Sequence, residues 1–452
     1  MQPVLAHVKW FSAFDFADQP VALRQVLTDA FWWLAALSLA VIALLVLVEE
    51  PARRSAMSKR LDAWLGRYRA NDVIIMRVGV FATLLWAWQL GVLFAPELAE
   101  WSSGIGWAQF VVALLMLLPR TVPIGGAALI GLYALGISHF GLFHMLDYLI
   151  FAGVGYMLLV SQFASVRWRA SGLPVMYATV GFCLAWLAAE KLIYPQWSLY
   201  LLDGHPELTF GIDHQFFLLA CAFIEFSLGY LLMMCLFERM LAIVITVTFF
   251  STSTVFGKTE VVGHTIIHAA LLVFLVKGEG DYYRPPIRMV RSLPARLTLA
   301  SVGFAVTLAA VLVPYAAQAA HQYERVAQGS RHRHDPIEVG GGDSAPTIKV
   351  TVTPDATGGW NVRLETTNFR FAPENVGGPH LPGEGHAHLY VDDRKVGRLY
   401  SQWHFLPPLA EGRHIIKVSL HANHHGPLLS EGRRIEASAS IVQEARTSSN
   451  PD

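Results

Sequence analysis

The sequence has few cysteines and few charged residues. Only three of its 452 residues are cysteine, and Cys183, Cys221 and Cys235 all lie within apolar stretches. This usage does not indicate a framework of structural disulfides. Charged residues make up 15% of the chain, and the acidic and basic ones balance to a net charge of zero. Because there is no basic excess, we do not expect a nucleic-acid partner.

Hydrophobic residues, by contrast, make up 54% of the chain, which is more than a soluble protein of this length carries. Apolar runs recur at roughly the 20-residue length that crosses the hydrocarbon core of a bilayer. The sequence therefore predicts a polytopic α-helical bundle in the lipid bilayer, with about ten membrane helices. The predicted helices run from Ala30 to Val48, Val73 to Phe94, Gly104 to Leu118, Val122 to Ile137, Phe143 to Val160, Leu173 to Leu192, Phe216 to Phe237, Met240 to Phe256, Val262 to Val276, and Leu297 to Ala317.

The orientation of the bundle is predicted from its basic residues, which accumulate in cytoplasmic loops. They follow the first, fifth and ninth predicted helices: Arg53, Arg54, Lys59, Arg60, Arg67 and Arg69; Arg167 and Arg169; and Lys277, Arg284, Arg288, Arg291 and Arg296. Both termini are therefore expected outside. The first 29 residues lack a charged region followed by a small-residue cleavage site, so we expect them to be retained. The predicted location is the inner (cytoplasmic) membrane of a bacterium, with a periplasmic C-terminal domain.

Composition also divides the chain into segments. Residues after Ala317 are rich in His, Arg, Gly and Asp and are predicted to be a linker. From Thr347 onward, polar and apolar residues alternate between Pro, Gly and Asp turns, which predicts about six or seven strands in an all-β sandwich. The predicted segments are 1–72, with the first helix and a basic cytoplasmic loop; 73–162, a helical bundle; 173–276, a four-helix unit; 297–317, the last membrane helix; 318–346, the linker; and 347–442, the His-rich β-sandwich.

Ionisable residues inside the predicted helices are functional candidates, because each costs roughly 2.5–3.5 kcal/mol at the centre of a membrane helix. Glu260, His264 and His268 recur every four residues, which aligns them on one helical face. His144 and Asp147 share a face by the same argument. The remaining ionisable residues at or just below the predicted outer face are His139, Glu190, Lys191, Asp213, His214 and Lys258, and Glu225 lies deeper in its helix.

Carboxylates and imidazoles on facing helices suit a metal such as zinc, iron or copper, and they equally suit proton transfer beside a quinone. Two other interpretations stay open. The groups could pair with one another and fix the packing of the helices, or they could lie at the interface and face water.

Four motifs resemble the DoxX family of four-helix membrane proteins. They are "EKLIYP" at Glu190 to Pro195, "LTFGID" at Leu208 to Asp213, "FIEFSLGYLL" at Phe223 to Leu232 and "FGKTEVVGH" at Phe256 to His264. The resemblance covers residues 173–276, and 73–162 would be a diverged copy in which "SHFGLFHMLDY" replaces the last motif.

The DoxX family includes a subunit of a thiosulfate:quinone oxidoreductase. The resemblance therefore implies catalytic roles for Glu190, Lys191, Glu260 and His264, with quinone as a cofactor. The extra helices and the C-terminal domain depart from the family and leave the substrate open, since a shared fold does not transfer a reaction.

Histidines are concentrated in the predicted β-domain. His386 and His388 are two residues apart in a strand pattern, so both imidazoles should emerge on one face of a sheet. The last methionine is Met289, and no cysteine follows it either, so the domain offers no sulfur ligand. An all-nitrogen site suits Cu(II) or Zn(II) and excludes a blue-copper centre. The domain resembles a cupredoxin-like copper-binding module; the alternative is that some of these histidines are surface residues. The candidate metal ligands are His386, His388, His404, His421, His424 and His425.

These features predict a membrane-bound protein for periplasmic redox or metal handling. In one version, the bundle exchanges electrons with the quinone pool as an oxidoreductase, with a second metal in the bundle. In another, the β-domain captures copper and delivers it to the bundle. In a third, the chain is a non-catalytic subunit that binds partner subunits of a membrane respiratory complex.

Overall fold

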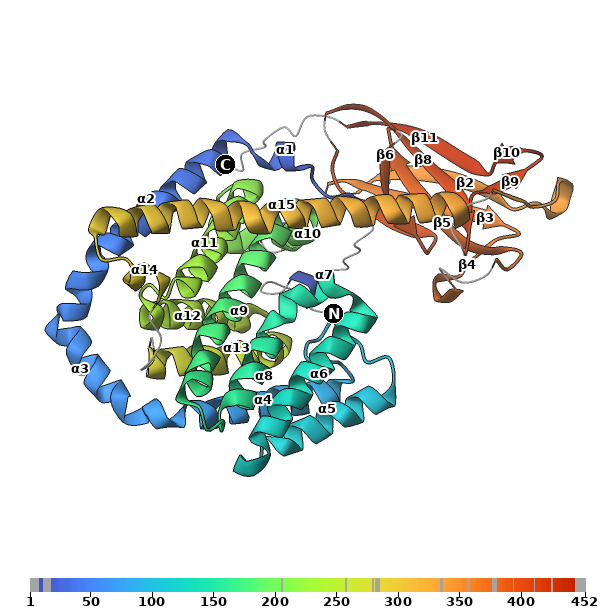
Figure 1. The fold of residues 1–452 in the computed structure, drawn as a ribbon. Coiled ribbons are helices and arrows are strands. Elements are labelled where there is room, and N and C mark those ends of the chain that lie inside the picture. Colours follow the sequence, from blue (N-terminus) through green and yellow to red (C-terminus); the bar gives the residue numbers. More distant parts are fainter. Residues whose placement is uncertain are drawn as a thin grey trace. The chain divides into compact units, whose positions relative to one another are not determined.

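The computed structural model describes residues 8–10, 18–204, 206–256, 258–278, 280, 285–333, 336–355, 358–375, 380–392, 394–409, 411–423 and 426–443. The chain divides into two units, Met1–Tyr323 and Glu324–Asp452. The first is helical, and the second is rich in β-strands (Figure 1). We call them the helical unit and the β-domain.

The helical unit contains long helices joined by short helical turns. Its α-helices are α1 (Leu23–Val26), α2 (Asp29–Arg54), α3 (Ala56–Leu65), α4 (Asp72–Leu90), α5 (Ser103–Leu115), α6 (Val122–Phe140), α7 (Leu142–Met145), α8 (Leu149–Val160), α9 (Val166–Ile193), α10 (Pro195–Gly204), α11 (His214–Met233), α12 (Glu238–Phe256), α13 (Lys258–Lys277), α14 (Pro286–Met289) and α15 (Leu293–Arg333). The 3-10 turns are η1 (Val8–Trp10), η2 (Gly66–Asn71), η3 (Pro119–Thr121), η4 (Leu146–Tyr148) and η5 (Pro206–Thr209).

Eight helical stretches of the described chain are long and apolar enough to cross a membrane. Each predicted span coincides with a helix, but α5 has only 13 residues. The multipass character is therefore confirmed by length and composition, while the exact number of spans stays a prediction. The eight stretches are Asp29–Arg54, Ala56–Leu90, Pro119–Phe140, Leu142–Val160, Val166–Ile193, His214–Met233, Thr259–Lys277 and Leu293–Glu324.

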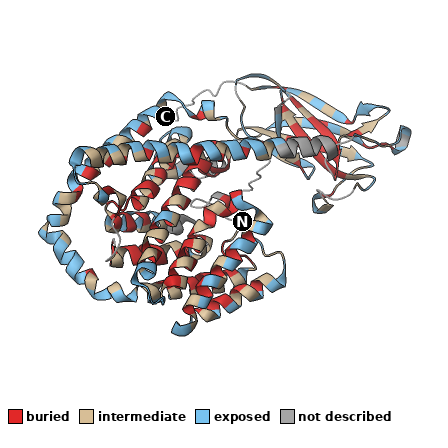
Figure 2. Ribbon diagram, viewed as in Figure 1, coloured by how far each residue is buried: buried red, intermediate tan, exposed pale blue. Residues whose placement is uncertain are grey.

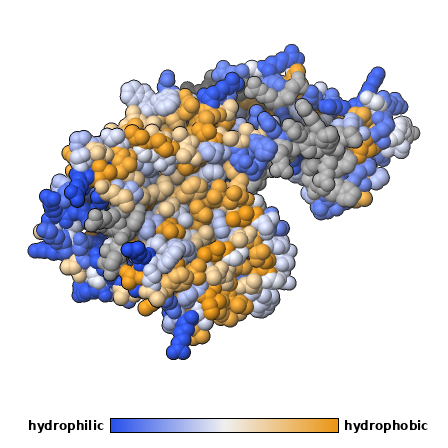
Figure 3. All heavy atoms as spheres, in the orientation of Figure 1, coloured by the Kyte–Doolittle hydropathy of each residue, from blue (hydrophilic) through white to orange (hydrophobic). Residues whose placement is uncertain are grey.

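The surface of the helical unit is apolar over much of its area (Figure 3). On α2, large side chains such as Trp33 and Leu37 are exposed, and on α15 Val302 and Val306 are exposed. Contiguous exposed apolar surface of this kind marks contact with lipid or protein, and the length of the helices favours lipid. The buried residues gather instead along the inward sides of helices such as α9 and α11 (Figure 2).

Glycines allow α9 and α11 to approach each other closely. A Cβ atom at Gly181 would lie 2.4 Å from the carbonyl oxygen of Gly229, and a Cβ at Gly229 would lie 2.4 Å from that of Gly181. Small residues at such a crossing let two membrane helices pack backbone against backbone. The crossing sets α9 firmly in the bundle, and α9 carries Glu190 and Lys191 at its C-terminal end.

The last helix is longer than predicted. α15 continues to Arg333, so the first part of the segment 318–346, which is predicted to be a linker, is helical. The reason is local propensity: the stretch "AAQAAHQYERVAQ" after Tyr315 contains mostly strong helix formers.

The described strands of the β-domain form three sheets. Their strands are β1 (Ile337–Glu338), β2 (Thr347–Pro354), β3 (Trp360–Thr367), β4 (Arg370–Phe371), β5 (Glu384–Val391), β6 (Arg394–Leu399), β7 (Trp403–Leu406), β8 (Gly412–Ala422), β9 (Leu428–Ser430), β10 (Arg433–Arg434) and β11 (Glu436–Gln443). One sheet has the order β11-β8-β5-β4, with β6 also paired to β5; the second is β2-β3-β7, and the third is β1-β9-β10. The β-rich character of the C-terminal region is confirmed.

Strands β5 and β8 each present one face to the apolar core and the other to polar neighbours. Ala387 and Leu389 of β5 lie in the core, so His386 and His388, which alternate with them, lie on the opposite face. The antiparallel register places His386 directly across from His421 of β8. The histidines of two strands are thereby collected on one face of the sheet.

Candidate functional sites

A cluster of charged side chains lies buried in the helical unit. We call Lys9, Glu97, His144, Asp147 and Glu190 the bundle cluster. Lys9 comes from η1, Glu97 from the loop between α4 and α5, His144 from α7, Asp147 from η4 and Glu190 from α9. Each of these side chains is at most 9% exposed. Buried charges in the membrane region of a protein are expensive, so this concentration is the strongest functional feature of the helical unit.

The ammonium of Lys9 bridges two carboxylates. Its Nζ lies 2.5 Å from Asp147 Oδ2 and 2.5 Å from Glu190 Oε2. The hydroxyl of Tyr315 donates a longer hydrogen bond, 3.5 Å, to the same Glu190 oxygen. Burial by itself lowers the pKa of Lys9, but the negative charges of Asp147, Glu190 and Glu97 outweigh burial, and the net pKa is raised. Lys9 is therefore a permanent cation in this cluster.

A second part of the bundle cluster contains the imidazole. His144 Nε2 lies 2.6 Å from Glu97 Oε1. Glu97, His144 and Asp147 each offer one potential ligand atom, and these three atoms lie within 4.8 Å of one another. This is close enough for them to share a metal ion. Such a set can also relay a proton, because carboxylates and imidazoles within hydrogen-bond reach exchange protons readily.

Trp10 connects the bundle cluster to the histidines of α13. Its indole N–H donates to the hydroxyl of Tyr148 at 3.1 Å, and its ring centroid lies 4.9 Å from that of His264. Gly263 makes room for the indole, because a Cβ there would lie 2.0 Å from the ring. His264 in turn places its Nδ1 3.4 Å from Glu260 Oε1.

The structure brings some of the predicted bundle residues together and separates others. Among Glu190, Lys191, Glu260 and His264, the side chains of Glu260 and His264 lie next to each other, and Glu190 contacts Lys9. Lys191 donates to Glu225 Oε2 at 2.7 Å, so these two predicted residues form an ion pair.

His139 and His268 lie elsewhere in the bundle, each against an aromatic ring. His139 stacks on Trp101 with centroids 4.2 Å apart, and His268 stacks on Phe250 at 4.6 Å. His268 also lines a hollow of about 310 Å³ between α12 and α13, whose other lining residues are apolar except for Thr246.

Lys9, Glu97 and Tyr315 were not predicted from the sequence. Lys9 lies outside every predicted helix, and Glu97 directly follows Pro96 in a loop. A signal for Lys9 does exist, since a lone lysine in the apolar string "AHVKWF" is unusual for a solvated N-terminal segment. No local pattern marks Glu97 or Tyr315.

A histidine cluster occupies the polar face of the β5–β8 sheet. We call His386, His388 and His421 the histidine cluster. The Nε2 atoms of His386 and His388 are 3.0 Å apart. The ring of His421 stacks on that of His388 with centroids 3.7 Å apart and lies 5.9 Å from that of His386. All three side chains are buried, and Ser419 Oγ lies 3.0 Å from His421 Nε2.

His388 is electrically neutral at ordinary pH, because its pKa is lowered from the usual value for histidine. Burial lowers the pKa of His388, and the nearby charges of His421, Lys395 and His386 lower it further. A neutral imidazole has a free lone pair and can ligate a metal, which a protonated one cannot.

The other predicted ligands do not join this cluster in the described chain. His404 lies on β7, which belongs to the β2-β3-β7 sheet, and burial lowers its pKa. His424 and His425 lie outside the described residues. The described part of the chain therefore brings three of the six predicted histidines together, and their role as metal ligands stays a prediction.

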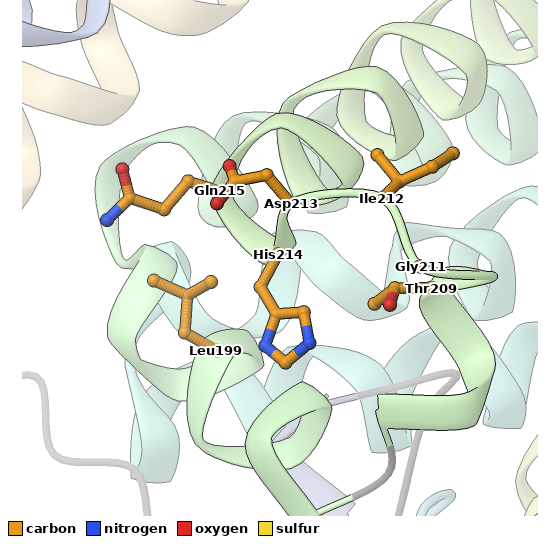
Figure 4. Close-up of a pocket in the computed structure, with 7 residues that line it drawn as sticks. All are labelled: Leu199, Thr209, Gly211, Ile212, Asp213, His214 and Gln215. Atoms are coloured by element: carbon orange, nitrogen blue, oxygen red, sulfur yellow. The ribbon is translucent and has the colours of Figure 1, made fainter. Parts of the chain in front are cut away.

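A separate open pocket of about 550 Å³ lies between α10 and α11 (Figure 4). Asp213 caps α11 there by accepting a hydrogen bond from the backbone N–H of Phe216. The lining residues are Leu199, Thr209, Gly211, Ile212, Asp213, His214 and Gln215. Its polar groups belong largely to the start of α11, so the pocket is explained by the capping of that helix.

The fold and the two clusters define a multipass membrane protein with a β-rich C-terminal domain. No known family model, curated protein or solved structure matches the chain. The functional argument therefore depends on the chain's own residues.

Proposed function

We propose that this protein handles metal at the bacterial inner membrane, with a periplasmic, cupredoxin-like β-sandwich that binds Cu(II) through the histidine cluster. The observation that carries the proposal is the 3.0 Å separation of His386 Nε2 and His388 Nε2. If a metal lies roughly 2.0–2.1 Å from each nitrogen, as is usual for imidazole ligands, the angle between the two nitrogens at the metal is about 95°. An angle of this size fits the tetragonal geometry that Cu(II) prefers.

The chemistry of the domain supports the same metal. The chain after Met289 contains neither cysteine nor methionine, so imidazole is the only strong ligand type available. Nitrogen ligands suit Cu(II), with Zn(II) as the competing ion, and they disfavour Cu(I). In this role the β-domain captures copper, and the bundle anchors it in the membrane.

The test is Cu(II) binding by the purified full-length protein, followed by titration and by electron paramagnetic resonance. We expect at least one equivalent of Cu(II) to bind with nitrogen hyperfine splitting and without intense blue absorption. The double variant His386→Ala/His388→Ala should lose more affinity than the roughly 10–100-fold that outer-shell changes cause. His414→Ala is the matched control, because His414 also lies on β8 but pairs with Asp392. Equal Cu(II) affinity in the double variant and the parent would refute the site.

A second candidate function is quinone-linked redox chemistry in the bundle, where the resemblance to DoxX proteins also points. The observation favouring it is the hollow beside His268. The Nδ1 atom of His268 is buried with no hydrogen-bond partner among the described residues. An apolar hollow with one unsatisfied polar group fits a lipid-soluble ligand such as a quinone, whose carbonyl oxygen would accept from the imidazole N–H.

Photoaffinity labelling with an azido-quinone tests this second function on the detergent-solubilised full chain. Label should appear in peptides of α12 and α13, and His268→Ala should reduce it. His139→Ala serves as the control, because His139 likewise stacks on an aromatic ring but lies on α6. If labelling is unchanged in His268→Ala, the quinone site is contradicted. If the protein loses its quinone-linked activity when it is purified away from partner proteins, a subunit role is favoured.

A further inference from the structure

The bundle cluster contains more negative than positive groups. Glu97, Asp147 and Glu190 are three carboxylates, and Lys9 is the one permanent cation among them. The nearby ammonium of Lys191 is already paired with Glu225 at 2.7 Å. With His144 neutral and the carboxylates ionised, two negative charges in the cluster are not offset by Lys9.

Ionised side chains that are buried together are costly unless protons or a cation offset their charge. An ion that leaves water for a protein interior loses several kcal/mol of hydration, and attraction to a counter-ion must replace it. The excess of carboxylates in this cluster favours the binding of protons or of a cation. One divalent cation would offset both remaining charges.

The geometry separates the cluster into two parts with different roles. Lys9 contacts one oxygen of Asp147, Oδ2, and one oxygen of Glu190. The other Asp147 oxygen, Oδ1, is buried, since the side chain is only 1% exposed. This oxygen accepts no hydrogen bond from the described chain. Asp147 thus has one oxygen committed to Lys9 and a second one available on the same carboxylate.

We propose that Glu97, His144 and Asp147 bind one divalent first-row transition metal, with Lys9 as the fixed cation that holds Asp147 and Glu190. The ligand atoms of these three residues already lie within 4.8 Å of one another. The site is separate from the histidine cluster and does not depend on the proposed copper function.

The donor set indicates the class of metal. Two carboxylates and one imidazole, without sulfur, suit Mn(II), Fe(II) or Zn(II) better than Cu(I). The contact of 2.6 Å between His144 Nε2 and Glu97 Oε1 is a hydrogen bond in the metal-free cluster. A metal entering there takes the place of the proton that these two atoms share, and that proton is released to solvent.

Mn(II) is the probe for this site, because its free ion gives a resonance signal that disappears on binding. The full-length protein should carry His386→Ala/His388→Ala, so that the histidine cluster does not compete. We expect it to bind one equivalent of Mn(II). His144→Ala and Asp147→Asn should each weaken binding by about 100-fold or more, since losing a residue that binds the metal directly costs more than losing one that only supports a ligand. His139→Ala should leave binding within about 2-fold, because His139 contacts Trp101 and Phe140 instead.

A second measurement needs no change in the bundle cluster, in case its variants do not fold. Protein labelled with ¹⁵N-histidine should show the coupling of one imidazole nitrogen to bound Mn(II) by pulsed resonance. No stoichiometric Mn(II) binding, or binding without imidazole coupling, overturns the proposal and leaves protons as the compensating charge. Cu(II) binding by the chain with an intact histidine cluster is measured separately, so either site can fail alone.

Discussion

His388 should make the stability of the metal-free β-domain depend on pH. Burial lowers its pKa in the folded domain, and neighbouring charges lower it further, so the folded state holds the imidazole neutral. The unfolded chain binds a proton at a pKa of about 6.5. Because the folded pKa is depressed, the stabilisation is complete above about pH 6.5 and is lost progressively as pH falls below that value.

The size of the effect follows from this linkage. Each pH unit below about 6.5 should cost roughly 1.4 kcal/mol for one histidine that stays neutral when folded. Between pH 7.5 and pH 5, His388 should therefore lower the free energy of unfolding by about 2 kcal/mol. His404, whose pKa is also lowered by burial, adds to the slope in the same direction.

Hydrogen exchange of peptides from β5 and β8, corrected for the intrinsic exchange rate at each pH, measures the effect in the full-length protein with a chelator present. His388→Gln removes the titrating group and keeps a polar side chain. The slope of unfolding free energy against pH in this variant should therefore fall by the amount that corresponds to about one proton. Val442→Gln, at an exposed position of β11, changes no titrating group and should keep the parent slope. If His388→Gln and the parent lose stability equally between pH 7.5 and pH 5, His388 is not the neutral group we infer.

Three further predictions concern packing and topology. Gly229→Leu should destabilise the helical unit by several kcal/mol in thermal unfolding, since its Cβ has no space against α9, whereas Gly131→Leu, with nothing within 4 Å, should be nearly neutral. Gly263→Ala should displace the ring of Trp10, cost about 1–3 kcal/mol and speed proteolytic trimming of the N-terminal segment; an unchanged rate would contradict the contact. Alkaline phosphatase, which is active only outside the cytoplasm, should be active when fused after Asp452. If a reporter that is active only in the cytoplasm is active at the same position, the proposed orientation is wrong.

Most predicted helices and strands follow from patterns that are local in the sequence. In a bilayer, a run of about 20 apolar residues can hydrogen-bond all its backbone groups only as a helix or in a closed barrel. The helical spans can therefore be predicted from the sequence without knowledge of the tertiary structure. The alternation of "HAHLYVDD" and "RHIIKVSL" identifies β5 and β8, and it places His386 and His388 on one face.

The partners of those residues are set by contacts between distant segments. His421 lies beside His386 because the antiparallel register of β5 and β8 aligns them. The sequence does not predict this register, because several registers are compatible with the same alternation of polar and apolar residues. Lys9 meets Asp147 and Glu190 across 138 and more residues of sequence. No periodic pattern marks a single lysine before the first helix as the cation of a site.

The sequence by itself therefore determined which segments form long apolar helices, which form strands and which histidines share a strand face, because each depends on hydrophobic periods of a few residues. The tertiary structure decided which charges meet: it paired Lys191 with Glu225, His144 with Glu97 and Lys9 with two carboxylates. The physical reason is that the cost of a buried charge can be offset by any opposite charge within reach. Only the packing of the helices decides which charges come within reach.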